Sequence, residues 1–144
     1  AEEVRAAFGR VVRPGEQALV QRMVPPGGVE AIVGAHRDPQ FGPLVMVGLG
    51  GVYVEVLREI AFRLAPPSRE EAREMLGETA LGRLLAGVRG QPPRDAEAVV
   101  EALCRVGWLM AEFPQVAEVD LNPLIVGEKG AWAVDVRIVV EARP

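Results

Sequence analysis

Apolar residues recur at intervals of three and four in several segments, the spacing of one face of an α-helix. Residues 2–12 carry such a stripe, and a longer one predicts a helix over about 95–113. Asp95 stands directly before the longer stripe and is a good N-cap. Two shorter helices are expected between them, one opening with the capping box Ser68-x-x-Glu71 and one over residues 79–86.

Strands are predicted where short apolar or alternating runs end at glycine or proline. These runs cover residues 18–24, 29–36, 44–47, 52–57 and 59–65. The tail reads as a hairpin, with strands 116–126 and 131–141 joined at Gly127-Glu128-Lys129-Gly130. This order of one helix, many strands, helices and a final hairpin indicates an α+β fold, a mostly antiparallel sheet with packed helices.

The final hairpin carries polar side chains at alternating positions. A turn centred on Glu128-Lys129 would pair residues whose numbers sum to 257, placing Asn122 opposite Asp135 and Asp120 opposite Arg137. Directly opposed side chains are about 4.5–5.5 Å apart at Cβ. A small set of oxygen donors suits Mg²⁺, which takes its remaining ligands from water and phosphate. The alternative interpretation is a solvated polar face closed by an Asp120–Arg137 pair.

Composition narrows the class of protein. The chain has 144 residues, 49% of them hydrophobic, which suits a single globular domain over residues 1–144. A net charge of −4 argues against a general nucleic-acid binder. One cysteine, Cys104, permits neither an internal disulfide nor a cysteine-based zinc site, and it favours a reducing, cytoplasmic setting. No apolar run is long enough to span a membrane.

Three other features have a structural interpretation as their first explanation. The run Gly48–Gly51 could hold phosphates through backbone N–H groups, but it lacks the spacing of known phosphate loops and is expected to be a plain turn. His36 is isolated on a strand face, where a hydrogen-bonded or surface histidine is expected. Cys104 lies in the middle of a predicted helix and is expected to serve packing.

Several motifs, in order, resemble one protein family. The segments QRMVPPGGVEAIVGAHRDPQFGPLVMVGLGGVYVEVL, LAGVRGQPPRD, EVDLNPLIVG and AVDVRI resemble the ATP-grasp domain of NDP-forming acyl-CoA synthetases. That family includes the nucleotide-binding subunit of ADP-forming acetyl-CoA synthetase and, more distantly, the β subunit of succinyl-CoA synthetase. The resemblance covers about residues 2–140 and implies the C-terminal portion of an ATP-grasp module.

The resemblance also implies roles for individual residues, with ATP or ADP and Mg²⁺ as cofactors. The hinge strand beside the adenine would comprise Gln21, Arg22, Met23 and Val24. Glu30 would reach the ribose hydroxyls. Asn122 and Asp135 would hold Mg²⁺, and Asp120 would be a further acidic group at the metal. No residue of the chain is assigned a catalytic role.

Parts that the family uses elsewhere are absent from this sequence. The resemblance therefore implies a fragment without the N-terminal lobe, which needs that lobe and a CoA-binding, phosphohistidine-bearing subunit or domain as partners. The isolated chain is expected to bind nucleotide weakly and to catalyse no turnover. Two alternatives stay open: a non-catalytic, synthetase-like regulatory module of a protein acetyltransferase, and a structural assembly domain. The acyl substrate, the choice of ADP or GDP and the oligomeric state are not readable from the sequence.

Overall fold

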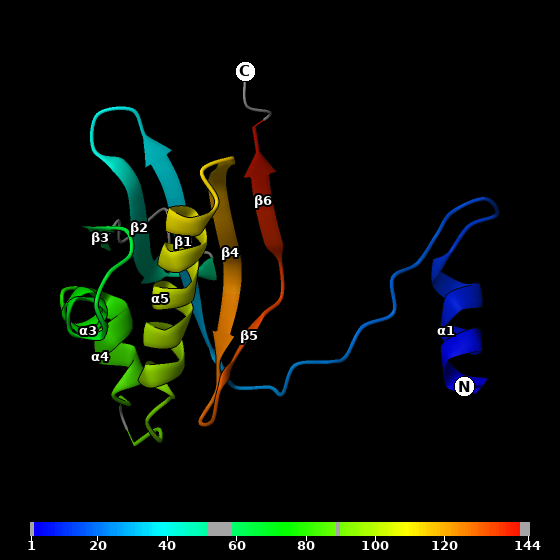
Figure 1. Ribbon diagram of the computed structural model, residues 1–144. Coiled ribbons are helices and arrows are strands. Elements are labelled where there is room, and N and C mark those ends of the chain that lie inside the picture. Colours follow the sequence, from blue (N-terminus) through cyan, green and yellow to red (C-terminus); the bar gives the residue numbers. More distant parts are fainter. Residues whose placement is uncertain (1, 52–58, 89, 142–144) are drawn as a thin grey trace.

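The protein is built on one antiparallel sheet, seen in a computed structural model that describes residues 2–51, 59–88 and 90–141. Its strands are β1 (Val29–Asp38), β2 (Gly42–Leu49), β3 (Ile60–Leu64), β4 (Val116–Val126), β5 (Ala131–Ala133) and β6 (Val136–Val140). The spatial order is β3-β2-β1-β4, after which β5 and β6 both pair with β4 (Figure 1). The α+β prediction is confirmed, and the predicted strand over 52–57 lies outside the described residues.

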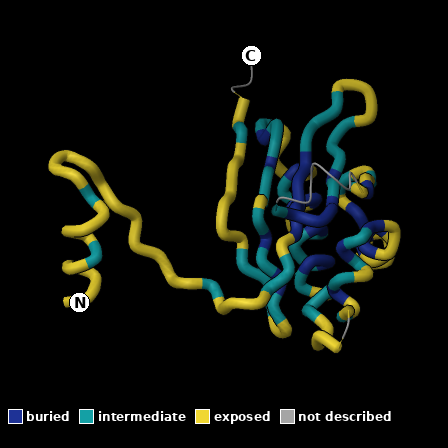
Figure 2. The backbone as a smooth tube through the Cα atoms, turned by 180° about the vertical axis from the view of Figure 1, so that it is seen from behind, coloured by how far each residue is buried: buried dark blue, intermediate teal, exposed yellow. Residues whose placement is uncertain are grey.

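Three helices cover one face of this sheet. They are α3 (Arg69–Gly77), α4 (Ala80–Leu85) and α5 (Ala96–Glu112). The core lies between the two layers, where Val33 and Val47 of the sheet and Leu103 of α5 are completely buried. Figure 2 shows this buried interior, and the strands of the central sheet run through it. Among the described residues, no helix is both long enough and apolar enough to cross a bilayer.

The predicted helix starts are confirmed in atomic detail. Ser68 accepts a hydrogen bond from the Glu71 backbone N–H (3.2 Å), and the Glu71 carboxylate accepts one from the Ser68 N–H (2.8 Å). Asp95 caps α5 by accepting a hydrogen bond from the Ala98 N–H at 3.1 Å. These bonds satisfy backbone donors that have no partner inside the first turn of a helix.

The N-terminal segment lies apart from the sheet. Helix α1 (Glu2–Val11) forms as predicted, but residues 12–28 run as an extended and mostly exposed segment to β1 (Figures 1 and 2). The predicted strand over 18–24 is therefore wrong. A strand needs a neighbouring strand for its backbone hydrogen bonds, and the part of the chain that the structure describes supplies none there. The apolar stripe of α1 is also uncovered, with Phe8 49% exposed.

The predicted pairing of the C-terminal hairpin is confirmed. Leu124 pairs with Ala133 and Asp120 with Arg137, so most partners sum to 257. The second strand, expected to be continuous over 131–141, is instead interrupted by a bend at Val134 and Asp135. Because of that bend Trp132 lies on the opposite face from Val136 and Ile138, whereas an unbroken strand would place all three on one face.

A bulge accompanies this bend. On the other side of β4, Ala31 pairs with Leu124 and Val33 with Leu121, so β4 carries one extra residue between them. That extra residue falls at Asn122-Pro123, where proline lacks the N–H that a regular ladder requires. The irregularity therefore coincides with the pair of residues predicted to hold a metal.

Candidate functional site

The candidate site lies on the sheet face that the helices leave uncovered. In β1, the side chains of Ala31, Val33 and Ala35 point into the core, so the alternate residues point to the open face. Glu30 lies at the end near the linker. Gly34 is next to Asp120 of β4, and His36 is next to Glu118. The open face thus has an acidic centre along β4.

Asn122 and Asp135 lie directly opposite each other on this face. The Asn122 backbone N–H donates a hydrogen bond to the Asp135 carbonyl oxygen at 3.2 Å, and the Val134 N–H donates to the Pro123 carbonyl at 3.1 Å. Both Asn122 and Asp135 are exposed. The bend at Val134–Asp135 follows the bulge in β4, so the two strands stay paired through the irregularity. The backbones of Asn122 and Asp135 are therefore neighbours across the two strands.

A second acidic group, Asp120, is two residues before Asn122 on β4. Burial raises the pKa of the Asp120 carboxyl, and the negative charges of Glu118 and Asp135 raise this pKa further, while the Arg137 guanidinium acts in the opposite direction. Arg137 is opposite Asp120 in the ladder, but its guanidinium donates to the Glu118 carboxylate at 2.9 Å. The expected Asp120–Arg137 pair is thus replaced by a diagonal Glu118–Arg137 pair. Sequence spacing alone does not distinguish opposite from diagonal contacts, because a long side chain reaches both.

Glu30 is held by the turn that follows β2. The Gly50 N–H donates to the Glu30 carbonyl oxygen at 2.8 Å, so this turn crosses the start of β1. A Cβ added to Gly51 would collide with a Glu30 carboxylate oxygen, and Gly51 has φ +69°. Glycine is therefore required at Gly51 both by the backbone and by the neighbouring carboxylate. The run Gly48–Gly51 was expected to be a plain turn, but Gly48 and Leu49 complete β2, and the chain leaves the strand only at Gly50.

The predicted hinge residues lie in the extended segment that precedes β1. Gln21, Arg22 and Met23 are exposed and Val24 is half-buried, with Met23 89% exposed. Directly after them, residues 25–28 line a hollow of about 320 Å³ together with Trp132 and the turn at Gly127–Lys129. The only lysine of the sequence, Lys129, is thus next to the linker.

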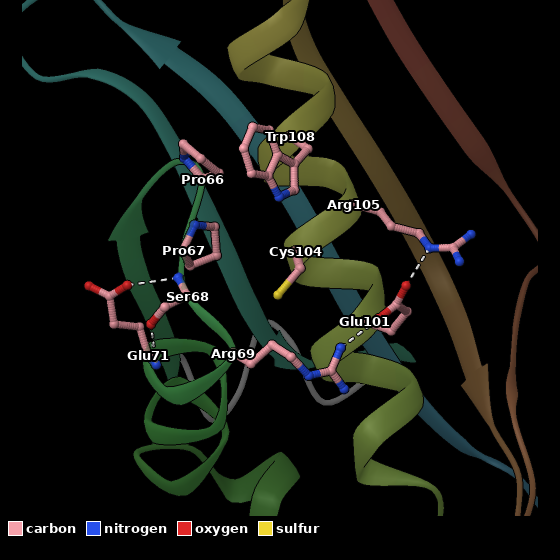
Figure 3. Close-up of a pocket in the computed structure, with 9 residues that line it drawn as sticks. All are labelled: Pro66, Pro67, Ser68, Arg69, Glu71, Glu101, Cys104, Arg105 and Trp108. Atoms are coloured by element: carbon pink, nitrogen blue, oxygen red, sulfur yellow. Dashed lines mark hydrogen bonds and ion pairs between the residues drawn. The ribbon is translucent and has the colours of Figure 1, made fainter.

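A second, larger hollow lies on the helical side, far from the acidic centre. Figure 3 shows this groove of about 530 Å³ between Pro66-Pro67 and α5, with Cys104 and Trp108 on its wall. Arg69 and Arg105 both bind the Glu101 carboxylate at 2.7 Å. Burial raises the pKa of the Cys104 thiol, which disfavours the reactive thiolate. This groove therefore offers packing and ion pairs rather than a reaction centre.

The donor set of the open face fits a magnesium ion that keeps most of its other ligands. Within the described ranges, no three His, Cys, Asp or Glu side chains come close enough to hold a metal by themselves. Mg²⁺ is commonly bound by one or two protein oxygens, with water and phosphate oxygens completing the octahedron. Asn122 and Asp135 would supply two such oxygens.

Comparison with known proteins identifies relatives of this chain by sequence. The chain is 52% identical over 125 residues to Acetate--CoA ligase [ADP-forming] I of Archaeoglobus fulgidus, covering 87% of this chain and 18% of that protein. It is 41% identical over 148 residues to Acetate--CoA ligase [ADP-forming] I subunit beta of Pyrococcus furiosus, covering 96% of this chain and 63% of that one. The chain thus spans less than two thirds of either relative.

A solved structure shows the same fold. Acetyl-coenzyme A synthetase 1 of Ca. Korarchaeum cryptofilum was determined with coenzyme A and Mg-AMPPCP, its phosphohistidine segment pointing towards the nucleotide binding site. It matches with a TM-score of 0.78 and 50% identity over 81% of this chain and 55% of that one. The resemblance to ADP-forming acyl-CoA synthetases is confirmed. The ATP-grasp domain model matches residues 1–140, and the chain belongs to the ATP-grasp family.

Proposed function

We propose that this chain forms the nucleotide- and magnesium-binding part of the ATP-grasp module in an ADP-forming acyl-CoA synthetase. The whole enzyme would convert an acid, CoA and ATP into acyl-CoA, ADP and phosphate. The γ-phosphoryl group would pass from ATP to a histidine of a partner subunit or domain and then to the acid, giving an acyl phosphate. CoA would displace that phosphate. The partner would also contain the CoA site.

The opposed pair of Asn122 and Asp135 carries this proposal. Phosphoryl transfer requires mainly positioning and neutralisation of charge. A magnesium ion supplies both when bound, because it bridges phosphate oxygens. Asn122 and Asp135 would hold that ion, and the half-buried Asp120 would add negative charge beside it. Asp120 and Asn122 are two residues apart on β4, and Asp135 lies in the bend before β6.

The nucleotide would lie along β1 from the linker towards the acidic centre. Gln21, Arg22, Met23 and Val24 would border the adenine, with backbone groups as donors and acceptors. Glu30, fixed by the Gly50–Gly51 turn, would accept hydrogen bonds from the ribose hydroxyls. Glu30 pairs with Ile125 and Gly34 with Asp120, so Asn122 lies between these two levels of the sheet. The ribose and the phosphates would therefore lie one after the other along β1, from the level of Glu30 towards the level of Gly34.

A preceding lobe is expected to close over the nucleotide, so the isolated chain should bind it weakly. A cytoplasmic location, expected from the single cysteine, stays a prediction. A regulatory or purely structural role would require no phosphoryl transfer through Asn122 and Asp135. These alternatives therefore differ from the proposal in what substitution of the pair does.

The test is substitution of Asn122 and of Asp135 by alanine in the complete protein. A contact with a charged group contributes about 1.5–3 kcal/mol, and about 1.4 kcal/mol is a factor of ten. We therefore expect each variant to weaken Mg-nucleotide binding about tenfold or more in isothermal titration. Glu141→Gln, which changes an exposed residue at the far end of the same hairpin, is the matched control. Unchanged binding in both alanine variants would exclude the proposed metal site and favour a structural role.

A further inference from the structure

An apolar patch borders the acidic centre on the open face of the sheet. It consists of four side chains from β2 and β3: Leu44, Met46, Phe62 and Leu64. The ladder pairs Leu44 with Leu64 and Met46 with Phe62, so all four share one face. Phe62 is 46% exposed and Leu64 is 61% exposed. We call these four residues the β2–β3 patch.

The β2–β3 patch lies beside the end of the proposed nucleotide site that the terminal phosphate would reach. Met46 pairs with Gly34 and Leu44 with His36. On the other side of β1, Gly34 pairs with Asp120. The ribose end, at Glu30, lies four residues back along β1. The patch therefore flanks the phosphate end of the site and not its nucleoside end.

Gly34 is buried and lies between Met46 of the patch and Asp120 of β4. A Cβ at this position would lie 3.1 Å from Met46 Cγ and 3.5 Å from the Val119 carbonyl oxygen. Because glycine has no Cβ, the Met46 side chain packs against β1 at this position, so the patch reaches the strand that pairs with Asp120. A neighbour that rests on Met46 and Phe62 is thus separated from Asp120 by the single strand β1.

We propose that the β2–β3 patch is the docking surface for the partner domain or subunit that carries the phosphoryl-accepting side chain. This inference rests on the proposed function and adds the place where the partner sits. An acceptor must reach the terminal phosphate in line with the bond that breaks. The partner that carries the acceptor therefore needs a binding surface beside the phosphate end. Exposed apolar side chains at that place would become buried against the partner.

The chain's own N-terminal segment arrives from a different side. The linker joins the sheet at the start of β1, and α1 lies beyond β6, on the side away from β3, in both views (Figures 1 and 2). A lobe connected through that linker would approach over the nucleoside end. Much polypeptide is also available as a partner, since the chain spans only 18% of the Archaeoglobus fulgidus relative. These observations favour the acceptor-carrying partner as the occupant of the patch.

The experiment uses the complete enzyme with Phe62→Gln and Leu64→Gln, singly and together. The matched control is Trp108→Gln, which changes an exposed aromatic side chain on the helical side. We would measure single-turnover transfer of phosphate from γ-labelled ATP to the protein, and Mg-nucleotide binding by titration. We expect the double variant to slow labelling about tenfold or more, with the nucleotide Kd changed less than about twofold. Phe62→Leu, which retains an apolar contact, should restore most of the rate, and this guards against misfolded variants.

Three results would overturn the docking proposal. Unchanged labelling in a folded double variant would show that the partner sits elsewhere. Equal loss of labelling and nucleotide binding would assign the patch to the lobe that closes on the nucleotide. Unchanged labelling with a halved mass in sedimentation would assign it to a second copy of the chain. A failure of the metal site would instead be seen in Asn122→Ala, whose Mg-nucleotide binding would then be normal.

Discussion

Asp95 joins the longest helix to the hairpin that carries the candidate metal ligands. One carboxylate oxygen accepts the Ala98 N–H at the start of α5 (3.1 Å), and the other accepts the Gly130 N–H in the β4–β5 turn (2.7 Å). The Asp95 N–H donates to the Gly127 carbonyl at 2.8 Å. A single half-buried residue therefore fixes both the helix end and the turn that sets the hairpin register.

Replacing Asp95 should be costly, and two variants separate its two bonds. Loss of an N-cap costs about 1 kcal/mol, and a hydrogen bond to a charged group contributes about 1.5–3 kcal/mol. Asp95→Ala removes both, so we expect the free energy of unfolding to fall by about 2.5–4 kcal/mol. In Asp95→Asn the new amide side chain would still cap α5 but would present only one acceptor oxygen, so this variant should lose about 1.5–3 kcal/mol.

Urea unfolding of the complete protein measures these losses. Asp38→Ala is the matched control, because Asp38 also accepts two backbone N–H groups, from Gln40 and Phe41 at 2.8 Å, but within an exposed turn. We expect a smaller loss there. Mg-nucleotide binding should also weaken in Asp95→Ala, since the turn no longer holds the register. An Asp95→Ala loss no larger than that of Asp38→Ala would refute the inference that this carboxylate ties helix to hairpin.

Three further substitutions test the core and the electrostatics. Leu103→Ala, at a completely buried position, should lower the free energy of unfolding by about 2–5 kcal/mol, whereas Leu19→Ala, 85% exposed, should change it by less than about 0.5 kcal/mol; similar losses would contradict the two-layer core. Because the folded pKa of Asp120 is raised, its ionised form opposes folding, so Asp120→Asn should stabilise the metal-free protein at pH 7. That gain should vanish as pH falls below the ordinary value of 3.8, and a gain independent of pH in urea unfolding would contradict it. Hydrogen bonds from two arginines lower the pKa of Glu97 to about 2, so its stabilising effect is present above pH 4.5 and is lost as pH falls towards 2. Glu97→Gln should therefore flatten acid unfolding followed by circular dichroism, and Glu70→Gln, which removes only a 3.8 Å contact, should not.

Local patterns predicted those elements whose determinants lie close together in the sequence. The capping box at Ser68 and the N-cap at Asp95 are contacts between residues three apart, so their partners are visible in the sequence itself. The hairpin pairing followed from its short turn. The pair Asn122–Asp135 could be predicted for the same reason, although its role as a metal site stays a prediction.

Features that depend on distant partners could not be predicted. The segment 18–24 has the composition of a strand, but strand formation requires a neighbour that sequence alternation does not reveal. The second bond of Asp95, to Gly130, spans 35 positions and has no local signal. Arg137 forms its ion pair with Glu118 and not with the opposite Asp120. Its long side chain can reach either acid, so the sequence does not decide between them. The bend at Asp135 depends on the bulge in β4, for which Pro123 was the one available sign.

The exposed helix at the N-terminal side has a consequence for how the complete module assembles. None of the ten side chains of Glu2–Val11 is buried, and an isolated helix of that length is barely stable in water. In the proposed module, contact with the preceding lobe would stabilise this helix. The helical content of residues 2–11 would then report closure of that lobe. The emission of a fluorescent label beside Phe8 should therefore change when nucleotide binds, before any chemistry takes place.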